Sequence, residues 1–400
     1  MLAEVPLILI GLGLVAYAVL AGADFGAGMW TLLARGPHAD EQREHAHHSI
    51  GPVWEANHVW LVFVLVMAWT AYPVAFASIA STLIVPLGLA AIGIILRGAT
   101  YAVRSTAGDS LRGGAATVAF GISSVLTPFA LGAAAGAIAS GRVPVGNARG
   151  ELIGSWTTPT SAAIGVLFVV VGAYLAAVYL TADAARLGAD ELATAFRRRA
   201  LATGVVAGAI AALALVVLRS DAPALYQGLT SGAGLLAVAV SVLAGAATLL
   251  LVRRGADEPA RVVAAVAVAG VVAGWALAQR PDLLPGLTVS EAAAPDSVLW
   301  ALIVASLLGA ALLGPSLVYL FGLVLRGRFD EADERGEAPA PSPAVGGHAG
   351  PPGARAAALL FPLGIIGLVA SDAAPLRALA VLILLAGATA AVHLLAVADE

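Results

Sequence analysis

The sequence predicts an all-α protein, a polytopic transmembrane helix bundle of about nine spans. Composition, the length of the apolar stretches and the placement of arginine carry this prediction. Hydrophobic residues make up 60% of the chain and charged residues 12%, whereas a soluble domain has about 25% charged residues. A helix needs about 20 apolar residues to cross a membrane. Such stretches lie near 5–33, 52–78, 80–103, 115–139, 160–181, 200–218, 231–252, 260–278 and 297–325.

Length, flanking residues and prolines characterise the first four stretches as candidate membrane helices. The first two are long enough to extend beyond the hydrocarbon. The first has no basic leader and no small-residue cleavage site, so we expect a retained helix and not a removed signal. Pro86 and Pro128 interrupt the third and fourth stretches, and membrane helices tolerate such prolines as kinks.

The C-terminal part of the chain differs in composition from the rest. Residues 327–354 are rich in Pro, Gly and Ala with several acids, which is typical of a disordered linker. Apolar runs at 356–370 and 376–397 predict an extra C-terminal helix pair, either a hairpin or a partly re-entrant element. We therefore divide the chain into a membrane helix bundle (1–326), a linker (327–354) and a C-terminal apolar helical pair (355–400).

Arginine predicts the orientation, because short loops rich in arginine stay in the cytoplasm. All 21 basic residues are Arg, and fifteen of them fall in one set of alternate loops. The other set holds only four, Arg142, Arg149, Arg219 and Arg280. The N-terminus should therefore face outside, and the 327–354 linker should lie in the cytoplasm.

The second stretch opens with Trp54-Glu-Ala-Asn-His-Val-Trp60, which places Glu55 and His58 on one face of a membrane helix. A carboxylate in hydrocarbon costs several kcal/mol, so its presence suggests a function. The pair could relay protons. It could equally form a polar helix mouth, with Asn57, that bonds to loop backbone and water. A metal site is the weakest alternative, because one His and one carboxylate are too few ligands.

Topology collects further polar residues at the same depth. Asp24 lies near the end of the first stretch and Arg97 late in the third, so both should lie near Glu55 towards the cytoplasmic side. Arg97, Tyr101 and Arg104 follow the i, i+4, i+7 pattern and share a helix face. A deep arginine needs an acidic partner, which Asp24 or Glu55 could provide. Alternatively, Asp24 is solvated by lipid headgroups and the arginines extend to the surface.

Two features limit the metals and cofactors that the chain can bind. It has no Cys, which excludes disulfides and thiolate ligation of haem or iron–sulfur clusters within it. Only His58 and His393 lie in apolar runs, so we expect no haem in this chain. Four further histidines crowd the first cytoplasmic loop, where a solvated, weakly pH-sensitive surface is a better interpretation than a metal site. They are His38, His45, His47 and His48.

Three motifs resemble subunit II of the cytochrome bd-type quinol oxidases. Asp24–Met29 resembles the Asp-x-Gly-x-Gly signature that closes helix one of that family. Gly51–Leu61 resembles its Trp-Asp/Glu-x-Asn-x-Val-Trp-Leu element at the start of helix two. The segment from Leu96-Arg97-Gly98 to Arg104 resembles its Arg-Gly…Arg segment at the end of helix three. The resemblance covers roughly residues 1–329.

The resemblance implies two four-helix groups plus one peripheral helix, in a bacterial cytoplasmic membrane. It implies a haem-bearing subunit I as heterodimer partner, which holds haem b and haem d and reduces oxygen with electrons from quinol. The resemblance further implies contacts with a bound quinone, membrane lipid and a small single-span subunit. It implies no binding of nucleic acid. Glu55 would be the proton-uptake carboxylate, with Asp24, Arg97 and His58 on the proton pathway. Ala102 stands near where family members often have an acid, so His58 could substitute as a relay.

Two other functions are open on the sequence alone. A proton-coupled secondary transporter would place Glu55, Asp24 and Arg97 around a substrate cavity. The charged groups cluster at one end, however, and the sixth to eighth stretches are almost entirely apolar, which favours a partner-binding subunit. A structural scaffold without a proton role is the third hypothesis, and Ala102 makes it credible.

Overall fold

The computed structural model describes residues 2–36, 38–107 and 115–325, with the backbone alone at 50–55, 101–107, 115–117, 317–318 and 320–325. Its helices are α1 (Val5–Leu33), α2 (Ala39–Ala71), α3 (Pro73–Thr82), α4 (Ile84–Ala107), α5 (Ala115–Ala139), α6 (Pro159–Arg186), α7 (Asp190–Asp221), α8 (Pro223–Leu229), α9 (Gly232–Arg254), α10 (Asp257–Gln279), α11 (Val289–Ala292) and α12 (Asp296–Leu325). A 3-10 turn (Leu2–Glu4) precedes α1, and an antiparallel pair, β1 (Asp282–Leu284) and β2 (Leu287–Thr288), follows α10. The all-α class is confirmed, while the linker and the C-terminal pair at 355–400 lie outside the described residues.

Seven of the described helices are long and apolar enough to cross a membrane, and eight if α2 and α3 form one broken span. The apolar part of α4, Ile84–Thr100, is shorter than these. The chain is therefore an integral membrane protein by its helices, and the total of nine spans stays a prediction.

Local sequence explains where helices begin and end. Thr158 caps α6 by accepting a hydrogen bond from the Ser161 backbone N–H at 3.1 Å, and Pro159 follows it at the first helical position. At the end of α9, Gly255 adopts a φ of 75°, which is the left-handed conformation that closes a helix.

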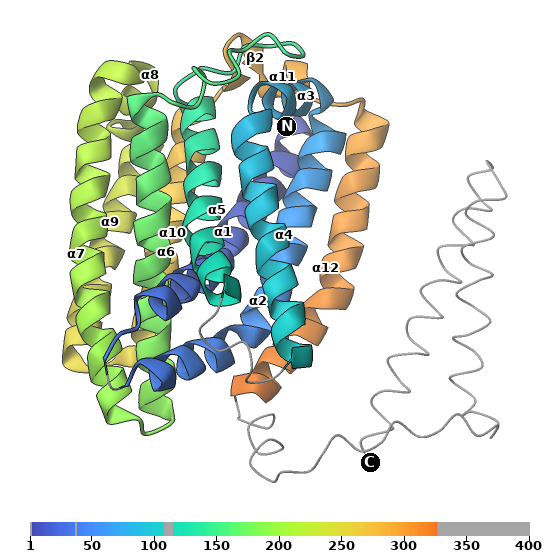
Figure 1. Cartoon of the computed structure of the whole chain (residues 1–400). Coiled ribbons are helices and arrows are strands. Elements are labelled where there is room, and N and C mark those ends of the chain that lie inside the picture. Colours follow the sequence, from blue (N-terminus) through green and yellow to red (C-terminus); the bar gives the residue numbers. More distant parts are fainter. Residues whose placement is uncertain (1, 37, 108–114, 326–400) are drawn as a thin grey trace, which may run out of the picture. The chain divides into compact units, whose positions relative to one another are not determined.

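The predicted span at 52–78 is broken, because the chain bends by 119° between 56–71 and α3. Pro73 starts α3 and disfavours helical geometry at the residue before it, so Tyr72 takes a φ of −135° and a ψ of 63°. Pro223 does the same between α7 and α8, where Ala222 takes nearly the same angles. Both short helices lie at the same end of the bundle (Figure 1).

The helix order repeats along the chain. In α1–α5 and again in α6–α10, two long helices are followed by a short helix after a proline break and two more long helices. α1 and α6 pack on each other, and each packs on helices of both sets. A Cβ at Gly26 would overlap the carbonyl oxygen of Gly172, so glycine permits the close approach of α1 and α6. The division into two separate four-helix groups stays a prediction.

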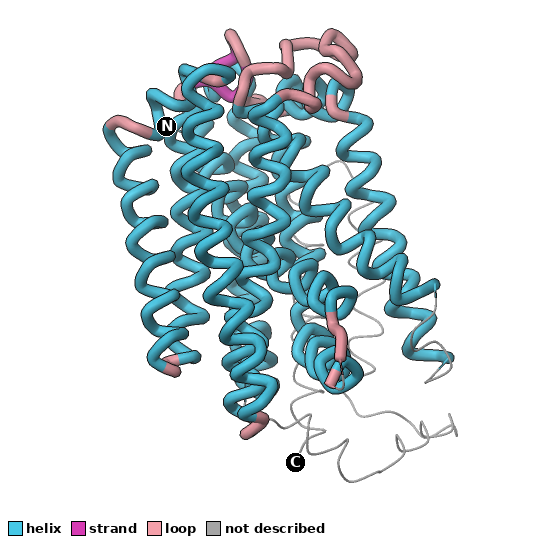
Figure 2. The backbone as a smooth tube through the Cα atoms, turned by 60° about the vertical axis from the view of Figure 1, so that its left-hand side comes forward, coloured by secondary structure: helices cyan, strands magenta, loops and turns pink. Residues whose placement is uncertain are grey.

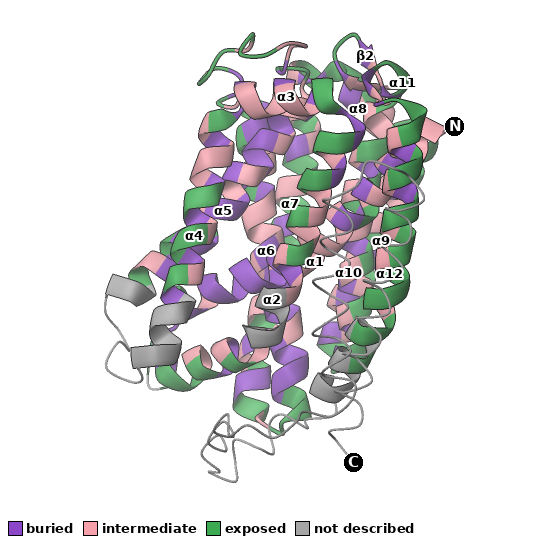
Figure 3. Ribbon diagram, turned by 90° about the vertical axis from the view of Figure 1, so that its right-hand side faces the viewer, coloured by how far each residue is buried: buried purple, intermediate pink, exposed green. Residues whose placement is uncertain are grey.

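The two ends of the bundle differ. The longer loops and both strands gather at the end where the N-terminus lies (Figure 2). The opposite end, which we call the arginine-rich end, carries Arg35, Arg43, Arg186, Arg197, Arg198, Arg199, Arg253, Arg254 and Arg261. Exposed residues lie on outward faces such as those of α4 and α12 (Figure 3). These faces are apolar, with Ile95 68% and Leu307 60% exposed, which suits lipid or a partner chain.

The predicted first cytoplasmic loop is shorter than expected. Helix α2 begins at Ala39, so His45, His47 and His48 lie on a helix and not in a loop. His45 is buried, and its Nε2 lies 3.0 Å from the carbonyl oxygen of Leu180 in α6. The expectation of a solvated surface is therefore wrong for His45, which anchors the start of α2 to α6.

Candidate functional site

A fully buried ion pair joins α1 and α4. Arg97 Nη2 donates a hydrogen bond to Asp24 Oδ1 at 2.5 Å, and Arg97 Nε donates to Asp24 Oδ2 at 3.1 Å. Nη2 also donates to the backbone carbonyl of Asp24 at 2.7 Å. The side chains of Arg97 and Asp24 are 1% and 0% exposed. Because bulk solvent does not reach either charge, each side chain depends chiefly on the other for compensation.

α5 supplies the remaining contacts of the guanidinium. Arg97 Nη1 donates to Ser124 Oγ at 2.6 Å, and the Ser124 hydroxyl donates to the carbonyl of Phe120 at 2.6 Å. The guanidinium carbon lies 4.0 Å from the centre of the Phe120 ring and 5.0 Å from that of Phe25. Aromatic faces attract cations, so these rings stabilise the charge while excluding water.

Asn57 connects α2 to the same carboxylate. Its Nδ2 donates to Asp24 Oδ2 at 3.0 Å, and its side chain is 1% exposed. We call Asp24, Asn57, Arg97 and Ser124 the Asp24 cluster. It draws one residue from each of α1, α2, α4 and α5.

The glycines of α1 make room for this cluster. A Cβ at Gly28 would overlap Ser124 Oγ and Arg97 Nη1. Only glycine at this position lets the guanidinium reach Asp24, one turn earlier on the same helix. The glycine-rich segment therefore serves close packing around an ion pair.

The structure brings together some of the predicted site residues and leaves others undescribed. Asp24, Arg97 and Asn57 meet, and full burial of Asp24 excludes the alternative in which headgroups solvate it. His58 is half-buried on α2, and the Trp60 ring packs edge-on against Phe63 with centroids 6.1 Å apart. Trp54 and Glu55 lie on α2, and Tyr101 and Arg104 on α4, but their side chains lie outside the described residues.

A second polar group, which the sequence did not predict, lies at the arginine-rich end. Asp183 Oδ1 accepts from Arg261 Nη1 at 2.9 Å and from Arg186 Nη2 at 3.0 Å. The Arg261 guanidinium carbon lies 4.9 Å from the centre of the Tyr179 ring. We call Asp183, Arg186, Arg261 and Tyr179 the Asp183 cluster. In the sequence, this cluster is indicated only by an acid, Asp183, four residues after Tyr179 and near the predicted cytoplasmic end of the fifth apolar stretch.

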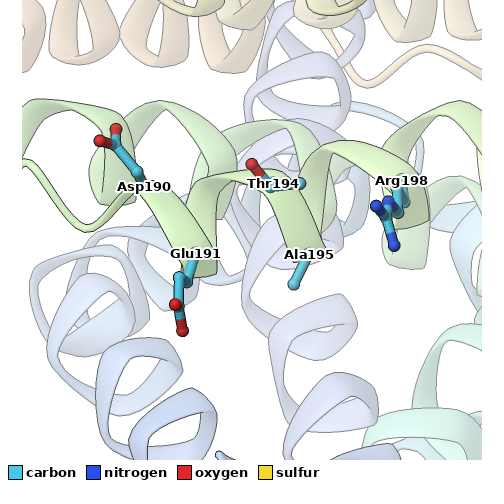
Figure 4. A pocket seen from close by; sticks show the side chains of 5 residues that line it. All are labelled: Asp190, Glu191, Thr194, Ala195 and Arg198. Atoms are coloured by element: carbon cyan, nitrogen blue, oxygen red, sulfur yellow. The ribbon is translucent and has the colours of Figure 1, made fainter.

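Neither of two hollows on the described residues has the lining of a substrate site. One of about 350 Å³ is lined by Asp190, Glu191, Thr194, Ala195 and Arg198, all on the first turns of α7 (Figure 4). No second element brings converging groups to it, as a ligand site requires. The cavity beside Asp24 holds about 20 Å³, room for about one water. A substrate cavity of the transporter type is therefore not favoured.

The described residues also offer no cluster of ligands for a metal ion. Among the described residues, no group of three or more His, Asp or Glu side chains is placed to hold a metal ion.

Comparison with known proteins decides the family. The family model for cytochrome bd terminal oxidase subunit II matches residues 2–324. The chain belongs to the cytochrome bd terminal oxidase subunit II family. The matched range contains the whole Asp24 cluster and ends before the predicted linker, close to the limit at 329 that the motifs indicated.

Individual members of the family are distant relatives. A Bacillus subtilis protein described as a cytochrome bd menaquinol oxidase subunit II is 24% identical over 216 residues, which is 53% of this chain and 61% of the relative. The Escherichia coli K12 cytochrome bd-I ubiquinol oxidase subunit 2 is 32% identical over 99 residues, 24% of this chain and 25% of the relative. The matches thus span less than two thirds of these relatives.

A solved structure extends the match over most of the fold. A chain of the bd oxidase from Geobacillus thermodenitrificans aligns with a TM-score of 0.68 and 26% identity. The alignment covers 81% of this chain and 98% of that chain. The helix bundle is therefore that of a subunit of a bd oxidase.

Proposed function

We propose that the chain is the non-haem subunit of a bd-type quinol:oxygen oxidoreductase of the bacterial respiratory chain, and that it guides protons from the cytoplasm towards a haem-bearing subunit I. The observation that carries the proposal is the Asp24 cluster, a buried polar group across four helices inside the family match. Relatives described as subunits of menaquinol and ubiquinol oxidases support the activity of the complex.

In this proposal, haem b and haem d belong to the partner subunit, and two observations on this chain support that assignment. The chain has no Cys, and the buried imidazole of His45 already bonds the Leu180 carbonyl at 3.0 Å. A bound quinone, lipid and a small single-span subunit would contact the apolar outer faces. The arginine-rich end would face the cytoplasm, with the N-terminus outside.

Glu55 is the proposed proton carrier of this chain. It lies on α2 two residues before Asn57, so its backbone is held next to the Asp24 cluster. The charges of Asp24 and Arg97 cancel, so the Asp24 cluster has no net charge that would oppose the binding of a proton by Glu55. His58 lies three residues on and shares a face with Glu55, which suits a relay where Ala102 replaces an acid.

The test is Glu55→Gln in the assembled oxidase, with Glu41→Gln as the matched control. Glu41 lies on the same helix with a side chain 55% exposed. We expect Glu55→Gln to lower quinol oxidase turnover by at least about tenfold, with unchanged haem absorbance per complex, and Glu41→Gln to change neither. Unchanged turnover and proton uptake in Glu55→Gln would reject the proton role in favour of a structural scaffold.

A further inference from the structure

We infer that a cavity between α1, α2, α6 and α10 binds a water molecule that joins Asp183 to Asp24, and that Asp183 is the outer carboxylate of a proton path from the cytoplasm. The inference rests on the proposed function, because it names the route by which protons would reach the Asp24 cluster from the second half of the chain.

The cavity lies between the two clusters and touches both. Asp24 lines it from α1, Ser49 from α2, Tyr179 and Asp183 from α6, and Arg261 from α10. The small side chains of Ala23, Ala27 and Ala176 leave the space open, and Leu180 completes the wall. Its volume of about 20 Å³ exceeds the roughly 10–15 Å³ that one water needs.

The polar groups on the wall retain hydrogen-bonding capacity. Asp183 Oδ1 accepts two hydrogen bonds, but Oδ2 accepts none from the described residues. The hydroxyls of Ser49 and Tyr179 likewise have no hydrogen-bond partner in the described part of the chain. Among the described residues, Asp24 Oδ1 accepts only from Arg97, and it has a second lone pair. A buried water is stable with two to four polar partners, which this wall provides.

Asp183 is connected to the surface as well as to the cavity. Its own side chain is 9% exposed, while Arg261 and Arg186, which both bond it, are 20% and 38% exposed. Glu258, 61% exposed, lies 3.8 Å from Arg261. Exposure thus rises stepwise from Asp24 at 0% through Asp183 to the arginine-rich end.

The proton balance of the path is simple. Asp183 takes a proton from bulk water and becomes neutral. It then passes a proton to the cavity water as that water releases one to Asp24 Oδ1, which leaves the water unchanged and Asp183 ionised again. Asp24 then passes the proton to Glu55, the proton carrier of the proposed function, and the Asp24 carboxylate regains its ion pair with Arg97. One proton moves, and no other group is consumed.

The first test detects the water in the complete oxidase complex by radiolytic hydroxyl labelling, since radicals form where water is bound. Tyr179 lines the cavity, whereas Tyr174 on the same helix is a buried tyrosine that does not. We expect Tyr179 to be labelled at least about fivefold faster than Tyr174 if one water is bound. Ala27→Val adds two methyl groups to the cavity and should abolish the difference, whereas Ala21→Val, on the same helix away from the cavity, should not.

The second test measures the proton role. We expect Asp183→Asn to lower quinol oxidase turnover about tenfold, more strongly at higher pH, where protons are scarce, and Asp183→Glu to restore it. The matched control is Asp257→Asn, because Asp257 is an acid 8% exposed that bonds Arg197 at 2.6 Å but does not line the cavity. Turnover of the control should be unchanged.

The outcomes separate this inference from the proposed function. Equal labelling of Tyr179 and Tyr174 would mean a dry cavity and overturn the inference. Labelling without any effect of Asp183→Asn on turnover would overturn the proton path. If Asp183→Asn acts as expected while Glu55→Gln has no effect, the inference stands and the role of Glu55 fails.

Discussion

Replacing Arg97 by Met tests the energetic role of the Asp24 cluster. The substitution removes two hydrogen bonds to the Asp24 carboxylate and one to its backbone carbonyl. Among the described residues, that 0% exposed carboxylate then keeps only the bond from Asn57. Removing one partner of a buried ion pair costs about 3–5 kcal/mol. An unfolding entropy of about 2.1 cal/mol/K per residue gives about 0.8 kcal/mol/K for this chain of 400 residues. We therefore expect the thermal unfolding midpoint of the purified complex to fall by about 4–6 °C.

The design includes a rescue and a control. Adding Asp24→Asn to Arg97→Met removes the uncompensated charge, so the double variant should recover at least half of the lost stability. Arg280→Met is the control, because Arg280 bonds Glu4 at 2.6 Å with both side chains 43% exposed, and such pairs contribute about 0–1 kcal/mol. A midpoint for Arg97→Met within the range of Arg280→Met would refute the argument.

Three further substitutions test other parts of the structure. Gly26→Leu should separate α1 from α6 and abolish assembly of the complex, whereas Gly11→Leu, whose Cβ meets nothing within 4 Å, should assemble normally; equal yields would contradict the packing. Tyr17→Phe should leave stability unchanged or raise it by about 1 kcal/mol, because the buried Tyr17 hydroxyl has no partner among the described residues; a loss in thermal unfolding would show a partner. Hydrogen bonds from Thr288 hold the pKa of Glu291 below its usual 4.5, so its stabilisation is present above pH 4.5 and disappears as the pH falls through the lowered pKa. Glu291→Gln should therefore flatten the acid dependence of stability, and an identical pH profile would argue against the cap.

Hydropathy predicted most of the helices, because a helix satisfies its own backbone hydrogen bonds inside a membrane. Such a helix then needs only an apolar stretch long enough to cross the hydrocarbon. It failed at Tyr72, where the apolar run continues through a proline that breaks the helix. It also failed at His45, since helix α2 continues past the apolar stretch, and its packing on α6 is a tertiary contact that sequence spacing does not report.

Part of the candidate site was predictable for a similar reason. Topology placed Asp24 and Arg97 at one depth, and a deep arginine requires an acid. Ser124 and Phe120 could not be predicted, because nothing in the α5 sequence marks which face meets Arg97. The Asp183–Arg261 contact joins residues 78 positions apart, and it depends on the packing of α6 on α10.

The most direct test of the central claim is purification of this chain, tagged, from its native membrane with its natural partners. The account predicts that a haem-bearing, multi-span subunit co-purifies, with haem b and haem d bands in the visible spectrum and quinol-dependent oxygen consumption. Isolation of the intact chain without any haem-bearing subunit would contradict it.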